Sequence, residues 1–376
     1  MRLVSQSLQC VEVPPMIKGR ILFDVTKASR QREKSGLARV SSCLKHELQT
    51  LLGPRFLEVI WDGRKETFRP RLKQKDFRVE ENDVFLTGEL FCEFERVGIE
   101  RFLSEWPCHA YAIFHDAIPM QHPEFTWPHS VQRHPSYMKM LTLFTGVFGV
   151  SSHSSILLEE YWEWLDVGSV PSVKPIQLGA DGVFAESSPP KTVHEDRLQV
   201  MMLGIVEKRK GQDLALQAAR FLWDEGLEFD LHIVGRTNPY FGKTIERLLK
   251  DAAKAGYPVR LHGQVGETAL QQRFLNTDLI LLPSLAEGCG LPVLESLWKG
   301  VPTLSSGLHS VRENSRFGGC ELFDTGNVKA LTEALRSMVL DRRKLQQLTD
   351  GIQTSILPRW EKTARDIIDH MVTEGG

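Results

Sequence analysis

Two acidic residues eight positions apart, Glu287 and Glu295, mark the segment of this sequence best suited to chemistry. They follow an apolar run at 279–282 that predicts a buried strand, and the residues after it predict a helix. Gly288 and Gly290 let the backbone approach a ligand closely. Carboxylates at such a junction accept hydrogen bonds from vicinal hydroxyl groups, which a sugar and a ribose share. A solvated surface helix is the alternative, and the flanking glycines and apolar residues argue against it.

A second junction, from Gly204 to Gly211, places three cations, Lys208, Arg209 and Lys210, in one turn. If the next helix starts near Gly211, Arg209 and Lys210 converge on its electropositive N-terminal end. A diphosphate would be held there by the forked donors of arginine and the point charge of lysine. A solvated basic turn is the other interpretation, and this segment alone does not decide between them.

The elements that must position these residues alternate along the chain in the pattern of parallel sheets with crossover helices. Strands are expected at 20–25, 57–61, 83–86, 110–114, 146–150, 175–178, 200–203, 231–234, 259–261, 279–282 and 301–304. Helices are expected at 37–52, 154–165, 328–340, 343–353 and 359–372. Ligands of such sheets bind beyond the carboxyl ends of the strands, which is where both junctions lie.

The fold class is therefore α/β, with two domains. Residues 1–180 form the first domain, with 1–17 expected as a flexible arm. Residues 181–196 are polar and proline-rich, which is typical of an inter-domain linker. Residues 197–357 form the second domain.

Composition and missing motifs exclude several classes of protein. Lys plus Arg is 46 against 48 for Asp plus Glu, so no nucleic-acid partner is expected. The sequence contains neither the dinucleotide fingerprint nor a P-loop, which excludes a standard dehydrogenase and a P-loop NTPase. It also contains no D-x-D pair to chelate a cation bridging a diphosphate, so no metal is expected.

The cysteines and the apolar segments favour a cytoplasmic protein. Six cysteines are scattered without C-x-x-C pairing, as expected in a reducing compartment. The first residues contain no apolar run of signal-peptide length. The longest uncharged stretch, 140–158, is too rich in glycine and serine to span a membrane.

Several segments resemble the retaining glycosyltransferases of family 4. Glu287 to Glu295 resembles their E-x7-E motif in the form E-G-x-G-L-P-x-L-E, and Gly204 to Gly211 resembles G-T-I-E-P-R-K-N. In the first domain, 35–40 resembles T-G-I-x-R-V, 115–119 and 122–124 resemble D-x-I-P followed by H-P-E, and 177–181 resembles L-G-x-D. In motif style the sequence is most similar to bacterial mannosyl- and rhamnosyltransferases of surface polysaccharide assembly.

The resemblance implies the GT-B architecture, in which two Rossmann-like domains face each other across a cleft. Residues 1–180 would bind the acceptor and 197–357 the nucleotide sugar. Residues 358–376 would form a helix that crosses back onto the first domain.

The resemblance also assigns roles to matching positions. Arg209 and Lys210 would neutralise the donor diphosphate and stabilise the departing nucleoside diphosphate. Glu295 would bind the ribose hydroxyls, and Glu287 a donor-sugar hydroxyl close to the reacting carbon. His115 would lie near the donor sugar, with a plain hydrogen-bonding histidine as the alternative. His115, Glu287, Arg209 and Lys210 are the expected catalytic set.

Backbone groups complete the expected donor site. Gly36 would let the first-domain loop approach the diphosphate, but its neighbour is Ser35, where many relatives have a second glycine. The base would be recognised by the backbone near Gly235, Gly263 and Val265. The other expected donor contacts are Gly204, Ser284, Gly288, Cys289, Gly290 and Leu291.

The expected reaction moves a hexose, with mannose from GDP-mannose as the first choice, to a glycan or lipid-linked glycan. It would retain the anomeric configuration by a same-face mechanism that needs positioning and no protein nucleophile. A UDP-sugar or GDP-rhamnose donor, a nucleotide-sugar hydrolase or epimerase, and a non-catalytic assembly protein are the alternatives. Peripheral association with the inner face of the membrane and the oligomeric state stay open.

Two further patterns in the sequence each allow two interpretations. Six of the twelve histidines fall between His109 and His153, but their spacing matches no metal-ligand pattern. Aromatic residues of the first domain either line an acceptor groove or belong to the core. They are Trp127, Tyr137, Phe144, Tyr161, Trp162 and Trp164.

Overall fold

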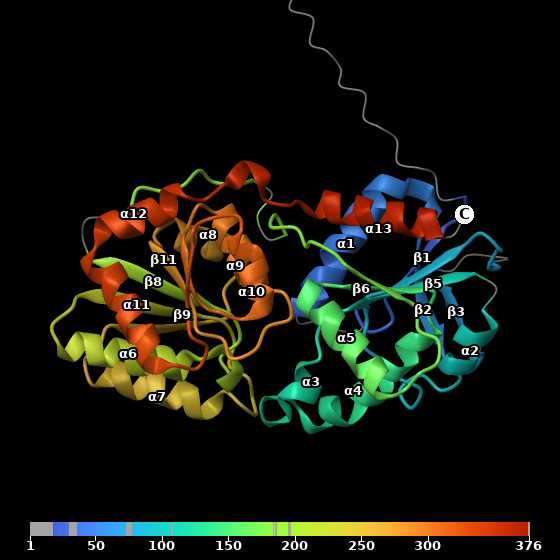
Figure 1. Cartoon of the computed structure of the whole chain (residues 1–376), viewed down its shortest axis with the longest axis horizontal. Coiled ribbons are helices and arrows are strands. Elements are labelled where there is room, and N and C mark those ends of the chain that lie inside the picture. Colours follow the sequence, from blue (N-terminus) through green and yellow to red (C-terminus); the bar gives the residue numbers. More distant parts are fainter. Residues whose placement is uncertain are drawn as a thin grey trace, which may run out of the picture.

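The computed structural model describes residues 18–29, 36–72, 77–106, 108–182, 184, 186–194 and 197–374. These residues form two α/β units, each built on one sheet (Figure 1). The expected arm at 1–17, Ser35 and the linker positions 183, 185, 195 and 196 lie outside the described residues. The α/β fold class with two largely parallel sheets is confirmed.

The first sheet has seven strands in the order β3-β2-β1-β4-β5-β6-β7. All neighbouring pairs are parallel except β2 and β3. Strands β1, β4 and β6 are buried at every residue, as expected where helices cover both faces of a sheet. The strands are β1 Ile21–Asp24, β2 Phe56–Asp62, β3 Thr67–Pro70, β4 Val84–Thr87, β5 His109–Phe114, β6 Gly146–Gly149 and β7 Ser172–Pro175.

The second sheet has six strands in the order β10-β9-β8-β11-β12-β13, and all its pairs are parallel. Strand β8 therefore lies directly beside β11, and the two candidate junctions follow these neighbouring strands. The strands are β8 Leu198–Leu203, β9 Phe229–Val234, β10 Val259–Gly263, β11 Leu279–Leu282, β12 Thr303–Ser306 and β13 Cys320–Phe323.

Helices connect the strands. The α-helices are α1 Gly36–Leu52, α2 Ile99–Glu105, α3 Ile118–Gln121, α4 Pro128–Met140, α5 Ser152–Trp164, α6 Gln212–Asp224, α7 Lys243–Lys254, α8 Glu267–Leu275, α9 Leu291–Trp298, α10 His309–Ser315, α11 Val328–Leu340, α12 Arg342–Asp350 and α13 Trp360–Glu374. The short 3₁₀ turns are η1 Gly53–Arg55, η2 Pro123–Phe125, η3 Leu141–Leu143, η4 Lys208–Lys210 and η5 Thr354–Ile356.

Four strands differ from the sequence-based expectation. The strand expected at 175–178 lies at Ser172–Pro175, because the apolar Ile176 and Leu178 that suggested it follow the strand and are buried in the core. The strand expected from residue 301 begins at Thr303, after Pro302, which has no N–H to donate. Strands β3 and β13 were not expected, because both are short edge strands whose side chains are partly exposed.

The last helix, α13, lies alongside α1 on the first unit, although it follows the second unit in the sequence (Figure 1). Trp360, at its start, is 2% exposed. The Trp360 N–H donates to Asp181 Oδ1 at 2.8 Å, and Ala180 N–H donates to Pro358 O at 2.8 Å. A Cβ at Gly179 would lie 2.3 Å from Trp360 N, so the chain needs a glycine there. These contacts join the end of the chain to the first unit.

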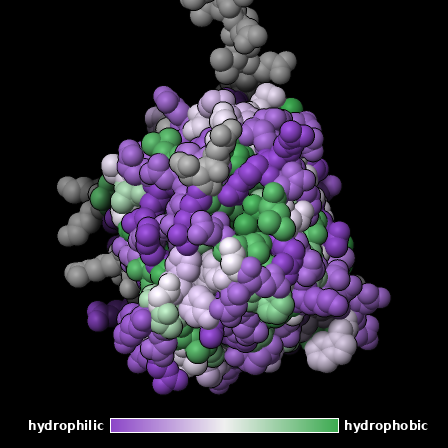
Figure 2. Space-filling model, turned by 90° about the vertical axis from the view of Figure 1, so that its left-hand side faces the viewer, coloured by the Kyte–Doolittle hydropathy of each residue, from purple (hydrophilic) through white to green (hydrophobic). Residues whose placement is uncertain are grey.

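Large apolar side chains are exposed in both units, among them Leu72 in the first and Leu340 in the second. Figure 2 shows the end of the molecule formed by the second unit, where hydrophilic side chains cover most of the face. Within the described part of the chain, no helix combines the length and the apolar character that crossing a bilayer requires. Of the first-domain aromatics, Tyr137, Phe144 and Trp162 are buried core residues, whereas Trp127 and Trp164 are 38% and 76% exposed.

We expect Trp360→Ala to destabilise the protein by about 3–5 kcal/mol, because it removes a buried indole between α13 and the loop that contains Gly179. Urea unfolding followed by tryptophan fluorescence and circular dichroism measures this. Lys362→Ala, on the exposed face of the same helix, is the matched control and should change stability by less than about 0.5 kcal/mol. Equal effects of the two substitutions would contradict the proposed anchoring.

Candidate active site

The basic turn η4 and the loop after β11 pack directly against each other. Gly211 has φ +68°, and a Cβ there would lie 2.0 Å from Pro283 O, so no other residue fits without a shift of the backbone. Leu285 N–H donates to Arg209 O at 2.7 Å. The structure thus brings the two junctions that the sequence suggested into one place.

Lys210 and Glu287 form an ion pair at this contact. Lys210 Nζ lies 2.6 Å from Glu287 Oε1, and both side chains are nearly buried, at 12% and 11% exposure. Ser284 Oγ also donates to Glu287 Oε1 at 2.6 Å, and Arg209 Nη1 lies 3.6 Å from Oε2. Although burial opposes ionisation, Lys210 and then Arg209 hold the pKa of Glu287 below its usual value. The carboxylate is therefore ionised.

Arg209 has two further partners that fix its guanidinium. Its Nε and Nη2 lie 3.1 and 2.8 Å from Glu207 Oε1, and its Nη1 donates to Ala286 O at 2.9 Å. Asn238 Nδ2 in turn donates to Glu207 Oε2 at 2.8 Å. Burial lowers the pKa of Arg209, but Glu287 and Glu207 outweigh it and raise the pKa. Sequence reasoning missed Glu207 and Asn238, although Glu207 matches the glutamate of G-T-I-E-P-R-K-N.

Glu295 lies in α9 and is 1% exposed. Its Oε1 is paired with Arg39 Nη1 of α1, which comes from the first unit. Its Oε2 accepts no hydrogen bond from the described residues. Burial raises the pKa of Glu295, and Arg39 and then Lys210 oppose that rise. Sequence reasoning missed the contact with Arg39, although this arginine is part of the segment that resembles T-G-I-x-R-V.

The loop between the two glutamates also contacts the first unit. A Cβ at Gly288 would lie 2.6 Å from His115 O. Ser151 Oγ and Ser154 Oγ donate to Gly288 O at 2.7 and 3.1 Å. Asn314 Nδ2 donates to Cys289 O at 2.7 Å. The loop is therefore held from both sides, and the two serines are further residues that sequence reasoning missed.

His115 is buried at the end of β5, and its Nε2 lies 2.9 Å from Gly88 O at the end of β4. Burial lowers the pKa of His115, so the ring is neutral. The structure places its backbone carbonyl, rather than Nε2, against the loop that contains Gly288.

The expected glycines occupy different kinds of position. Gly235 has φ +152°, and a Cβ there would lie 1.8 Å from Gly204 O, so the ends of β8 and β9 approach closely. Gly290 caps α9 at φ +65°, and Leu291 begins that helix. Gly36 and Gly263 face open space, and Val265 is half-buried near the end of β10.

A pocket of about 270 Å³ opens beside Glu287, between the two units. The first unit contributes residues 116–118, Gln121, His122, His153, Ser154 and Leu157. The second contributes residues 285–287, 307–310 and Thr325. The rings of His153 and His309 stack across the boundary with centroids 5.1 Å apart. Asp116 and these histidines are polar groups that sequence reasoning did not assign to the site.

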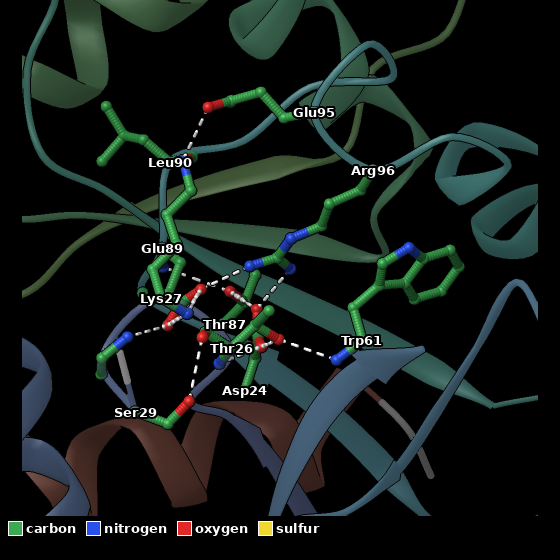
Figure 3. Close-up of polar contacts among 12 residues, drawn as sticks. Asp24, Thr26, Lys27, Ser29, Trp61, Thr87, Glu89, Leu90, Glu95 and Arg96 are labelled. Carbon is green, nitrogen blue, oxygen red and sulfur yellow. Dashed lines mark hydrogen bonds and ion pairs between the residues drawn. The ribbon is translucent and has the colours of Figure 1, made fainter. Parts of the chain in front are cut away.

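A buried polar network fixes residues 26–28, which lie just after β1 (Figure 3). Arg96 is 3% exposed and pairs with both Asp24, at 2.7 Å, and Glu89. Glu89 accepts the backbone N–H of Lys27 at 2.7 Å. Burial and then Asp24 raise the pKa of Glu89 to about 7, against Arg96.

Across the described ranges, no three or more His, Cys, Asp or Glu side chains gather closely enough to hold a metal ion.

Similarity to known proteins agrees with this geometry. A family model described as "Glycosyl transferases group 1" matches residues 184–354. The serotype-specific mannosyltransferase WbdA of Escherichia coli is 23% identical over 321 residues, which cover 76% of this chain and 37% of WbdA. Protein CapJ of Staphylococcus aureus is 30% identical over 139 residues, which cover 36% of this chain and 33% of CapJ. This chain thus spans well under half the length of both relatives.

Two solved structures share the whole fold. Sucrose-phosphate synthase of Thermosynechococcus elongatus superposes with a TM-score of 0.69 at 14% identity, covering 95% of this chain and 99% of that one. Anabaena HepE in complex with UDP and glucose superposes with a TM-score of 0.68 at 15% identity, covering 94% and 100%. At these identities the likeness shows the fold alone.

The pairing of Glu287 with Lys210 predicts an acid-sensitive contribution to stability. The pKa of Glu287 in the folded protein lies below its unfolded value of about 4.3. The ionised carboxylate therefore stabilises the fold above about pH 4.3, and this stabilisation is lost as the pH falls through the folded pKa. Glu287→Gln should therefore be less stable than wild type by about 2–4 kcal/mol near neutral pH, and the difference should shrink toward acid pH. Urea midpoints across the pH range measure it. A constant difference argues against the pairing, and Glu159→Gln, an exposed change on α5, is the control.

Three features agree with one another. They are the paired cations and carboxylates at neighbouring strand ends, the two α/β units, and the match of residues 184–354 to a glycosyl transferase family model. Residues 184–354 match the family of group 1 glycosyl transferases, in a chain that has the GT-B fold and resembles mannosyltransferases.

Proposed function

We propose that this protein transfers a hexose from a nucleotide sugar to a glycan or lipid-linked glycan, with retention of configuration and without a metal ion. The observation that carries the proposal is the cluster of Arg209, Lys210 and Glu287 at the ends of β8 and β11, beside a pocket shared by both domains. The remaining groups described above are arranged around this cluster.

The two cations are the proposed diphosphate site. Without ligand, Glu287 and Glu207 neutralise them and hold them in position. The diphosphate of a nucleotide sugar carries two negative charges, one more than either carboxylate alone, so it competes for the donors through short, charge-assisted hydrogen bonds. As the bond to the sugar breaks, negative charge grows on the departing phosphate, and preorganised cations stabilise that charge.

The two carboxylates are the proposed hydroxyl sites. Glu287 lines the pocket and would accept a hydrogen bond from the donor sugar. Glu295 has a buried oxygen without a partner among the described residues, and this oxygen suits a ribose hydroxyl. The backbone near Gly235, Gly263 and Val265 would recognise the base, and N–H groups at 288–291 the sugar or phosphate.

The proposed mechanism depends on positioning. The acceptor hydroxyl would attack from the face that the phosphate leaves, and the phosphate would take its proton. The neutral, buried His115 fits a hydrogen-bonding role near the sugar rather than that of a charged acid. Restricted motion of the two reactants and exclusion of water from the closed cleft would accelerate the reaction.

Mannose from GDP-mannose is the proposed donor, because the relative WbdA is a mannosyltransferase. A UDP-sugar is the second candidate, because HepE, which shares the fold, was solved with UDP and glucose. Release of nucleoside diphosphate without an acceptor would favour a hydrolase instead. The cytoplasm is the proposed compartment, in keeping with the unpaired cysteines.

We expect Lys210→Met to lower transfer by about 10²–10³-fold, because it removes a donor aimed at the departing phosphate. Nucleoside diphosphate release is measured over a panel of GDP- and UDP-sugars with glycan acceptors. Lys208→Met is the matched control, since Lys208 lies in the same turn but pairs with Asp213 and is 45% exposed. Its activity should stay within about threefold of wild type. The proposed donor site is wrong if no nucleotide sugar raises the melting temperature of the wild type.

A chelator should leave turnover unchanged, because Arg209 and Lys210 supply the countercharge that a metal ion would otherwise provide. The test is the same assay with and without EDTA. Loss of activity that Mg²⁺ or Mn²⁺ restores would contradict the metal-independent mechanism.

A further inference from the structure

The ion pair between Arg39 and Glu295 joins the two domains at the donor side of the cleft. Arg39 lies in the first turn of α1 in the first domain, and Glu295 lies in α9 of the second. Helix α1 holds Arg39 firmly, because Val40, Leu44 and Leu48 are buried in the core and the helix packs against α13. The contact therefore exists only while the domains face each other as they do here.

Glu295 needs this partner because of its surroundings. The side chain is 2% exposed, and an unpaired buried carboxylate takes up a proton at neutral pH. The charged groups that act on it are Arg39 from α1 and Lys210 from η4. Lys210 is already bonded to Glu287 at 2.6 Å, so Arg39 is the cation that contacts Glu295 directly within the described part of the chain. Around Arg39 itself lie Cys43 and Glu267.

The pair uses one carboxylate oxygen and leaves the other free. Arg39 binds Oε1, while Oε2 is buried and has no partner among the described residues. A buried acceptor without a partner is costly, so a ligand donor at this position would gain the full value of a charge-assisted hydrogen bond.

We infer that Arg39 is a positioning residue of the donor site, which keeps Glu295 ionised and aims its free oxygen at a ribose hydroxyl. The inference rests on the proposed function, and it couples ribose binding to closure of the domains. Closure brings Arg39 next to Glu295, and this makes the carboxylate a better hydrogen-bond acceptor for the ribose. By linkage, ribose binding stabilises the closed arrangement by the same free energy.

The test compares Arg39→Met with wild type by calorimetric titration of GDP and of UDP between about pH 6 and pH 8.5. Without Arg39 the pKa of Glu295 rises further, so the variant should bind about tenfold more weakly at the acid end. The deficit should shrink as the pH rises and Glu295 ionises, whereas wild type should change much less. Arg39→Lys should restore much of the affinity and the flatter pH profile.

Two controls separate this role from a general loosening of the cleft. Arg316→Met removes another contact between the domains, to Gln177, without touching Glu295, and should show no such pH dependence. A 2′,3′-dideoxy nucleoside diphosphate lacks the hydroxyls that Glu295 would accept. Wild type should bind it more weakly than the parent nucleotide, and Arg39→Met should add little further loss.

Each failure has a distinct meaning. If wild type binds the nucleotide and folded Arg39→Met binds it equally well across the pH range, the inference alone is overturned. If Arg39→Met weakens binding of the dideoxy compound as much as it weakens binding of the parent nucleotide, Arg39 does not act through the ribose, and the inference is again overturned. If wild type binds neither GDP nor UDP, the proposed function fails and this inference with it. Melting temperatures establish that each variant is folded.

Discussion

The buried ion pair between Lys210 and Glu287 is the constraint on which the rest of the site depends. Removing either charge from water is costly, and the pair tolerates burial only because its partners meet at 2.6 Å with Ser284 and Arg209 alongside. These groups lie 77 positions apart in the sequence. They meet because β8 and β11 are neighbours in the sheet, so the segments after them emerge side by side. The sheet order thus determines where the charges lie.

The first domain completes what the second begins. The serine hydroxyls of Ser151 and Ser154 bind the carbonyl of Gly288, between the two glutamates. Arg39 pairs with the second glutamate, and the pocket beside the first is lined from both sides. Glu295 therefore depends on a group from across the cleft, and Glu287 lines a pocket that both domains form. In the proposed reaction, ligand binding and closure of the domains would act on the same atoms, and closure would exclude water from the bound ligand.

The sequence was sufficient to predict the α/β class and most strands, because apolar periodicity is a local property. The expectation that the two junctions share one donor site came from the family resemblance. The sequence was not sufficient for β3 and β13, whose edge positions require few apolar residues. The sequence also did not predict the partners of Arg209 and Glu295, since these contacts depend on how segments far apart in the sequence are placed in space. His115 illustrates the limit: the strand end was predictable, but the bond of its ring to Gly88 follows from the pairing of β4 with β5.

Both domains contain a buried carboxylate whose charge depends on a neighbouring cation. In the second domain Lys210 keeps Glu287 ionised; in the first, one guanidinium, Arg96, serves both Asp24 and Glu89. Burial and then the nearby charge of Asp24 raise the pKa of Glu89 to about 7, against the effect of Arg96. Loss of a cation in such a place changes protonation as well as removing a contact. The charge of each buried carboxylate is therefore a property of its own network rather than of a single side chain.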